Sequence, residues 1–183
     1  MIITVRIGLL IAAIVVVAVV LQTSFFSTVP LLGSVPNVLP VVVICLGLLG
    51  GAVVGAEVGF GAGLLLDSIL LETLGITSLS LLIAGYLAGK YREGFEITNP
   101  LVPIGLVGGL TLVAGVAFAA IQLTLGVEAP VSLLIVREIV VQALLAALLA
   151  IPIYPGLRRL FRPALIEDAP KRSRVAGSPF RTA

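Results

Sequence analysis

The chain has 183 residues, of which 60% are hydrophobic and only 11% are charged. A soluble domain carries about 25% charged residues, so this composition indicates an integral membrane protein. The sequence contains no histidine, which excludes Ser-His-Asp triads and Cys-His dyads, and no set of cysteines or acids has the spacing of a metal site. We therefore expect no cofactor, no metal ion and no nucleic-acid partner.

The apolar segments predict one all-α domain, residues 1–163, built as a compact bundle of six transmembrane helices. The apolar run from Leu39 to Leu71 would form a helix of about 50 Å, which exceeds a hydrocarbon core of about 30 Å. We therefore place a break at Gly50-Gly51, with Pro36-Asn37 and Pro40 opening the second span. The predicted spans are about 7–26, 38–50, 52–71, 78–89, 101–124 and 133–155.

The placement of positive charge predicts the orientation of this bundle. With six spans both chain ends lie on one side, and that side receives every lysine and arginine except Arg137. Positive charge concentrates on the cytoplasmic side of membrane proteins, so both termini are expected there. Residues 164–183 are basic and poor in large apolar side chains, which predicts a disordered cytoplasmic tail that attracts anionic lipids.

A ladder of glycines runs through the second and third predicted spans. Its members lie four residues apart and end at an acid: Gly47, Gly51, Gly55, Gly59, Gly63 and Asp67. Glycine inside a helix costs about 1 kcal/mol relative to alanine, and in membranes the compensation is close approach of two helices. The break at Gly50-Gly51 leaves Gly55, Gly59 and Gly63 as one packing groove and assigns Gly47 to the preceding helix, facing a different direction.

Asp67 has three interpretations, because a carboxylate within a span costs a few kcal/mol unless it is paired, protonated or near water. In the first, the span ends early and Asp67 lies at the membrane interface together with Glu72. In the second, Asp67 accepts hydrogen bonds as an anchor of the bundle or of a partner. In the third, it belongs to an ion-coupled transport site. Few intramembrane polar groups accompany it, which favours the anchor. Arg137 and Glu138 open the sixth span at a similar depth, either as an interfacial boundary or with Arg137 as the partner of Asp67.

An ordered set of residues over about 36–91 resembles the rod shape-determining protein MreD family. That family has a proline-containing start to its second span, then G-x-x-x-G-F-x-x-G-L-x-x-D, a short turn with glycine, and a fourth span ending in Y-x-x-G. The matching residues are Pro36 and Pro40, then Gly55, Gly59, Phe60, Gly63, Leu64 and Asp67, then Gly75, then Tyr86 and Gly89.

This resemblance implies a non-enzymatic component of the bacterial inner membrane that belongs to the cell-elongation machinery. It implies binding to the single-span protein MreC and, through MreC or directly, to MreB filaments, RodA and the transpeptidase partner of RodA. The glycine grooves, with Phe60, Tyr86 and Gly89, would then serve packing or the docking of partner helices. Self-association stays open.

The same resemblance supplies an alternative, because MreD proteins are similar in fold to the substrate-binding subunits of vitamin ECF transporters. Such a subunit needs a cavity near the outer face, lined by aromatic and hydrogen-bonding side chains. The chain has no tryptophan and three tyrosines, and Tyr86 and Tyr91 are predicted at the cytoplasmic end. This composition argues against a site for a polar vitamin. An intramembrane enzyme is the weakest alternative, since no nucleophile-base pair is apparent.

Overall fold

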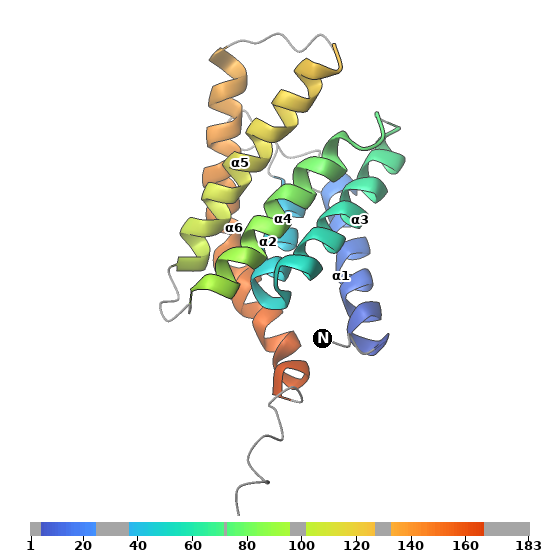
Figure 1. The fold of residues 1–183 in the computed structure, drawn as a ribbon, viewed down its shortest axis with the longest axis vertical. Coiled ribbons are helices and arrows are strands. Elements are labelled where there is room, and N and C mark those ends of the chain that lie inside the picture. The colour runs from blue at the N-terminus through green and yellow to red at the C-terminus, as the bar shows by residue number, and fades with distance from the viewer. Residues whose placement is uncertain (1–4, 25–36, 72, 96–101, 127–132, 167–183) are drawn as a thin grey trace, which may run out of the picture.

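The structure is a computed structural model and describes residues 5–24, 37–71, 73–95, 102–126 and 133–166. The described residues form six helices and no strand. The helices are α1 (Val5–Ser24), α2 (Val38–Gly50), α3 (Ala52–Leu70), α4 (Ile76–Gly94), α5 (Val102–Thr124) and α6 (Leu133–Ile166). Successive helices run in opposite directions, so the ends of α1, α3 and α5 lie with the beginnings of α2, α4 and α6 (Figure 1). We call this the cavity end of the bundle, and the opposite end the tail end.

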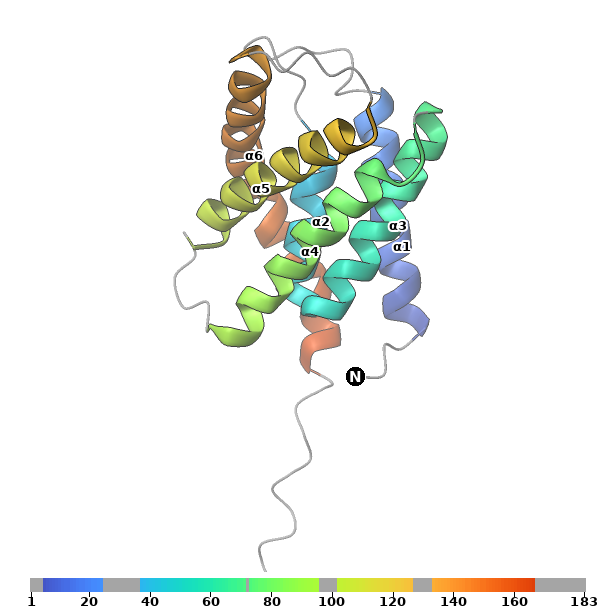
Figure 2. The same ribbon diagram turned by 45° about the horizontal axis from the view of Figure 1, so that its top comes forward.

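Helix α2 is the centre of the bundle. Every residue from Val38 to Leu49 is buried, and α2 contacts all five other helices. The others form an arc around it in the order α1, α3, α4, α5, α6, in which each contacts the next (Figures 1 and 2). A helix that is apolar on all sides suits a fully buried position, and the uniformly apolar sequence VLPVVVICLGLLG occupies such a position here.

Four described helices are long and apolar enough to cross a membrane. They lie within α1, α3, α5 and α6, over Ile7–Ser24, Ala52–Leu70, Val102–Thr124 and Val136–Phe161. Helix α2 has 13 residues and is therefore about 20 Å long, shorter than a hydrocarbon core of about 30 Å. Helix α4 is long enough but carries Lys90, Arg92 and Glu93 near its end. The described part of the chain thus has four helices typical of membrane spans and two, α2 and α4, that do not meet the same criteria of length and composition.

The turn between α2 and α3 lies where the length argument placed it. Gly51 alone separates the two helices, with φ 94° and ψ 179°, a conformation that is essentially restricted to glycine. The first backbone N–H of α3, on Ala52, has no partner within its helix and donates instead to Glu93 Oε1 of α4 at 2.9 Å. Glu93 therefore caps α3 from a neighbouring helix.

Replacing Glu93 with alanine is expected to destabilise the bundle by about 0.5–2 kcal/mol, the usual cost of losing a helix cap. Glu93→Gln keeps a side-chain oxygen that can accept from Ala52 and should lose less. Glu57→Ala is the matched control, because Glu57 is exposed on α3 and makes no hydrogen bond in the described part of the chain. The measurement is the thermal unfolding temperature in detergent. Equal unfolding temperatures for the Glu93→Ala and Glu57→Ala variants would contradict the capping role of Glu93.

Two helices extend beyond the predicted spans. Helix α4 covers Ile76–Gly94 where the sequence predicted 78–89, and α6 continues to Ile166 where the predicted span ended at 155. The boundary at Pro155 is corrected because Leu157 and Phe161 are buried against the bundle, which holds the added turns in place. Residues 164–166 of the predicted tail are therefore helical, and residues 167–183 lie outside the described part.

Candidate functional site

The glycine groove of α3 is filled by α4 of the same chain. A Cβ atom at Gly55 would overlap the carbonyl oxygen of Gly85, and one at Gly59 would overlap the carbonyl oxygen of Leu81. A Cβ atom at Gly63 would overlap the backbone of Ser78. These contacts are backbone to backbone, which is the close approach that the four-residue spacing predicted.

The groove also includes members that the sequence analysis placed elsewhere. A Cβ atom at Gly47 of α2 would lie 2.6 Å from the oxygen of Gly85 and 3.4 Å from Cα of Gly55, so Gly47 faces the same helix as its neighbours in the ladder. The prediction that Gly47 faces a different direction is wrong. Gly89 of α4 lies against the backbone of Gly51. Glycines of three helices therefore meet at α4, and no free groove is left there for a partner helix.

Phe60 and Tyr86, the aromatic members of the predicted site, lie on the outer surface of the bundle. Phe60 is 44% exposed and Tyr86 is 39% exposed. The hydroxyl of Tyr86 accepts a hydrogen bond from Lys90 Nζ at 3.2 Å, one turn further along α4. These two side chains do not converge on a common pocket with the glycines.

Asp67 is buried at the end of α3, with 1% of its surface exposed. Its Oδ2 accepts a hydrogen bond from the backbone N–H of Gly75 at 2.9 Å and a longer one from the Ser78 hydroxyl at 3.5 Å. Gly75 has φ 103°, so the turn that presents its N–H requires a left-handed conformation that glycine adopts easily. Asp67 thus connects α3 to the beginning of α4 by hydrogen bonds, as the interpretation of Asp67 as an anchor of the bundle predicts.

Arg137 is not the partner of Asp67. Both residues are described, no ion pair joins them, and Arg137 is exposed at the beginning of α6. The predicted contact is therefore corrected, since the turn after α3 already supplies donors to the carboxylate. Glu138 is also exposed, but it borders a cavity that the sequence analysis did not expect.

A cavity of about 750 Å³ occupies the cavity end of the bundle, and α5 contributes more of its lining residues than any other helix. Its lining includes Pro40 of α2, Leu81 of α4 and Thr111 of α5. The volume falls within the range of about 300–1,000 Å³ that is usual for ligand pockets.

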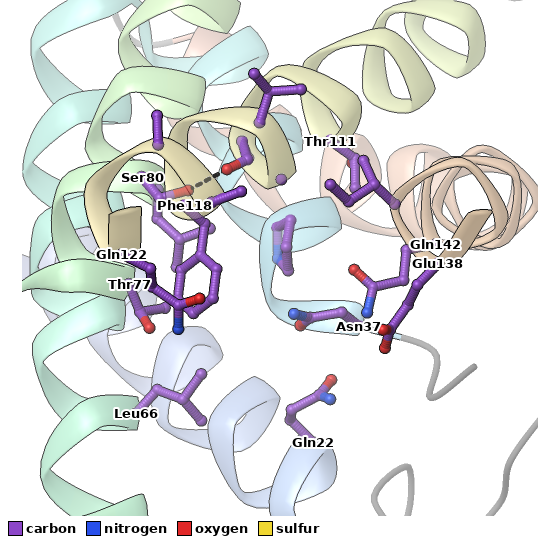
Figure 3. Close-up of a pocket in the computed structure, with 18 of the residues that line it drawn as sticks. Gln22, Asn37, Leu66, Thr77, Ser80, Thr111, Phe118, Gln122, Glu138 and Gln142 are labelled. Carbon is purple, nitrogen blue, oxygen red and sulfur yellow. Dashed lines mark hydrogen bonds between the residues drawn. The ribbon is translucent and has the colours of Figure 1, made fainter. Parts of the chain in front are cut away.

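Polar side chains from five segments line this cavity, and Figure 3 shows most of them directed toward one space. They are Gln22, Thr23, Asn37, Thr77, Ser80, Thr111, Gln122, Glu138 and Gln142. Some of these side chains already make hydrogen bonds within the protein. Gln22 Oε1 accepts a hydrogen bond from the N–H of Val38 at 2.7 Å, and the Ser80 hydroxyl donates one to the carbonyl of Ala114 at 2.6 Å. The Oδ1 atom of Asn37 is buried and has no hydrogen-bond partner in the described part of the chain.

The sequence analysis did not anticipate this cavity, since it argued from composition only that a site for a polar vitamin was disfavoured. Gln122 and Gln142 appeared in the sequence as isolated amides, typical of contacts between helices. Their similar depth in the membrane could have indicated that they lie close together. Gln122 lies near the end of α5 and Gln142 in the first part of α6, and these two successive helices run in opposite directions. Among the described residues no group of three metal-ligating side chains occurs. The lining offers hydrogen bonds and one carboxylate, which suits recognition of a bound group.

Comparisons with known proteins identify the family to which the chain belongs. The family model described as rod shape-determining protein MreD matches residues 3–163, which include every residue that lines the cavity. A search of curated proteins found no match, and a search of solved structures found none. Since the family model covers most of the 183 residues, the chain belongs to the MreD family, whose role is in rod shape determination.

Proposed function

We propose that this protein is a non-enzymatic membrane scaffold of the bacterial cell-elongation machinery, and that it binds MreC through the cavity. The observation that supports this proposal most is the cavity itself, a concave and partly polar surface of about 750 Å³. The groove formed by Gly55, Gly59 and Gly63 is already occupied by α4, so a partner must bind elsewhere.

The charge distribution supports an outward-facing cavity in the bacterial inner membrane. Lys90 and Arg92 lie near the end of α4, and Arg158 and Arg159 lie near the end of α6, all at the tail end of the bundle. By the positive-inside rule this end is cytoplasmic, with both termini, and all six helices then cross the membrane. The opposite end faces the periplasm, where the periplasmic part of MreC lies.

Binding to MreC would connect the protein to the remaining elongation components. In this proposal MreB filaments, RodA and the transpeptidase partner of RodA associate through MreC or directly, and the cytoplasmic basic surface also attracts anionic lipids. The protein positions these partners and carries out no chemistry of its own.

Co-purification of MreC with the tagged protein in mild detergent tests this proposal. Ala119 lines the cavity, and an Ala119→Phe variant fills part of that space, so it should retain less than about a tenth of the MreC, a loss equivalent to about 1.4 kcal/mol. Ala13→Phe is the matched control, because Ala13 is exposed on α1 outside the cavity. Equal MreC recovery with both variants would place the docking surface elsewhere.

The cavity also favours a second candidate function, a small-molecule-binding subunit of the ECF type. Native mass spectrometry of the protein purified from its host membrane distinguishes the two functions. A bound compound of constant mass that Ala119→Phe displaces would favour this second function, whereas an empty cavity together with MreC retention would favour the scaffold.

A further inference from the structure

Two hydrogen-bond acceptors in the cavity have no donor among the described residues. Asn37 Oδ1 is enclosed without a partner in that part of the chain, and Glu138 is the one charged residue among the described residues that line the cavity. Glu138 forms no ion pair with any described residue, and Arg137, its neighbour in sequence, does not line the cavity. In Figure 3 the side chains of Asn37, Glu138 and Gln142 gather on the same side of the space.

An unpaired acceptor of this kind favours a particular ligand chemistry. A buried carbonyl oxygen without a donor is expensive, and a carboxylate accepts hydrogen bonds but never donates them. No lysine or arginine among the described residues lines the cavity, so a positive charge that pairs with Glu138 there would come from a bound group. The walls beyond these groups are apolar, with Leu66, Val116 and Phe118 among them, and they suit an aliphatic stem.

We propose that the cavity receives a cationic hydrogen-bond donor, an ammonium or guanidinium group at the end of an aliphatic stem. The head group donates to the Glu138 carboxylate and to Asn37 Oδ1, and the stem contacts the apolar wall. This inference rests on the proposed function, under which the group is a lysine or arginine side chain of the partner segment that enters the cavity. A charge-assisted hydrogen bond to a carboxylate is the strong type, so this side chain would determine which segment fits.

Binding of small probes to the full-length protein in detergent tests the chemistry without a partner. n-Butylammonium and n-butylguanidinium supply the cation and stem, and n-butanol is the neutral control. We expect isothermal titration to show saturable binding of both cations at the cavity and at least tenfold weaker binding to Glu138→Gln, since hydrogen bonds to charged groups contribute this much. Glu57→Gln, on the exposed surface of α3, should bind the cations as the wild type does. Equal affinity for butanol, or unchanged affinity in Glu138→Gln, would overturn the proposal.

A second measurement uses MreC and separates this inference from the proposed function. If the wild type retains MreC, Glu138→Lys should release it and Glu57→Lys should not. Retention of MreC by Glu138→Lys would overturn the cation site while the scaffold function stands. If the wild type binds butylammonium through Glu138 but never retains MreC, the scaffold function fails, and the assignment of the cation to a partner side chain is overturned in favour of a free amine.

Discussion

A Gly59→Leu variant is expected to lose most of its folded protein. The added Cβ would overlap the carbonyl oxygen of Leu81, and that oxygen belongs to the backbone of α4, which cannot move aside as the end of a flexible side chain can. Overpacking usually costs about 1–3 kcal/mol and more where no rotamer relieves it, a large share of a typical stability of about 5–15 kcal/mol. The measurement is the yield of the monodisperse peak in size-exclusion chromatography, together with the unfolding temperature.

Gly61→Leu is the matched control for this experiment. Gly61 lies on the same helix two residues further along, and a Cβ atom there would meet nothing within 4 Å. This variant should keep the yield and unfolding temperature of the wild type, apart from any small change due to helix propensity. Similar behaviour of the two leucine variants would mean that α3 and α4 separate easily. If Gly59→Leu loses its fold as expected, any accompanying loss of MreC is a consequence of misfolding, because the groove is internal.

The Asp67→Leu variant should also lose much of its stability, though less than Gly59→Leu. It removes both hydrogen bonds to Oδ2 and leaves the N–H of Gly75 and the hydroxyl of Ser78 without that acceptor. Each stranded group costs about 1–3 kcal/mol, and one kcal/mol lowers the unfolding temperature of a chain of this size by about 2–4 °C. Asp67→Asn keeps a carbonyl oxygen at the same place and should lose much less.

Ser68→Leu serves as the control, since Ser68 is exposed and bonds only to the carbonyl of Leu64 in its own helix. Rod-shape complementation in a strain without its own MreD provides the functional readout. The anchor interpretation predicts that Asp67→Asn supports rod shape and Asp67→Leu does not. Equal loss of function in the asparagine and leucine variants, at unchanged stability, would indicate an ionised site and favour ion-coupled transport.

The glycine spacing and the length of the apolar run were sufficient to predict the close packing of α3 and the break at Gly51. Both depend on distances along one helix, which the sequence contains directly. Neither could identify the neighbour that fills the groove. A glycine face fits any helix that approaches closely, and only the complete bundle brings Gly85 and Leu81 of α4 to it.

The cavity could not be predicted for a related reason. Its lining brings together isolated amides from separate helices, such as Gln22 of α1, Gln122 of α5 and Gln142 of α6, and none of these amides belongs to a motif. An isolated amide in a span has the same sequence signature whether it faces another helix or an open space. The predicted sixth span ended at about 155, whereas α6 continues through Pro152 and Pro155 to Ile166, since membrane helices accommodate proline when neighbouring groups compensate.

The enclosed position of α2 has a consequence for how the protein is assembled during synthesis. Helix α2 emerges from the ribosome second, yet part of its surface is covered by α5 and α6, which are made last. A segment of 13 residues is too short to be a stable span by itself, so α2 depends on packing against later helices to hold its place in the bundle. Insertion of this chain is therefore completed by its final helix, and a chain truncated before Leu133 would leave its central helix uncovered on one side.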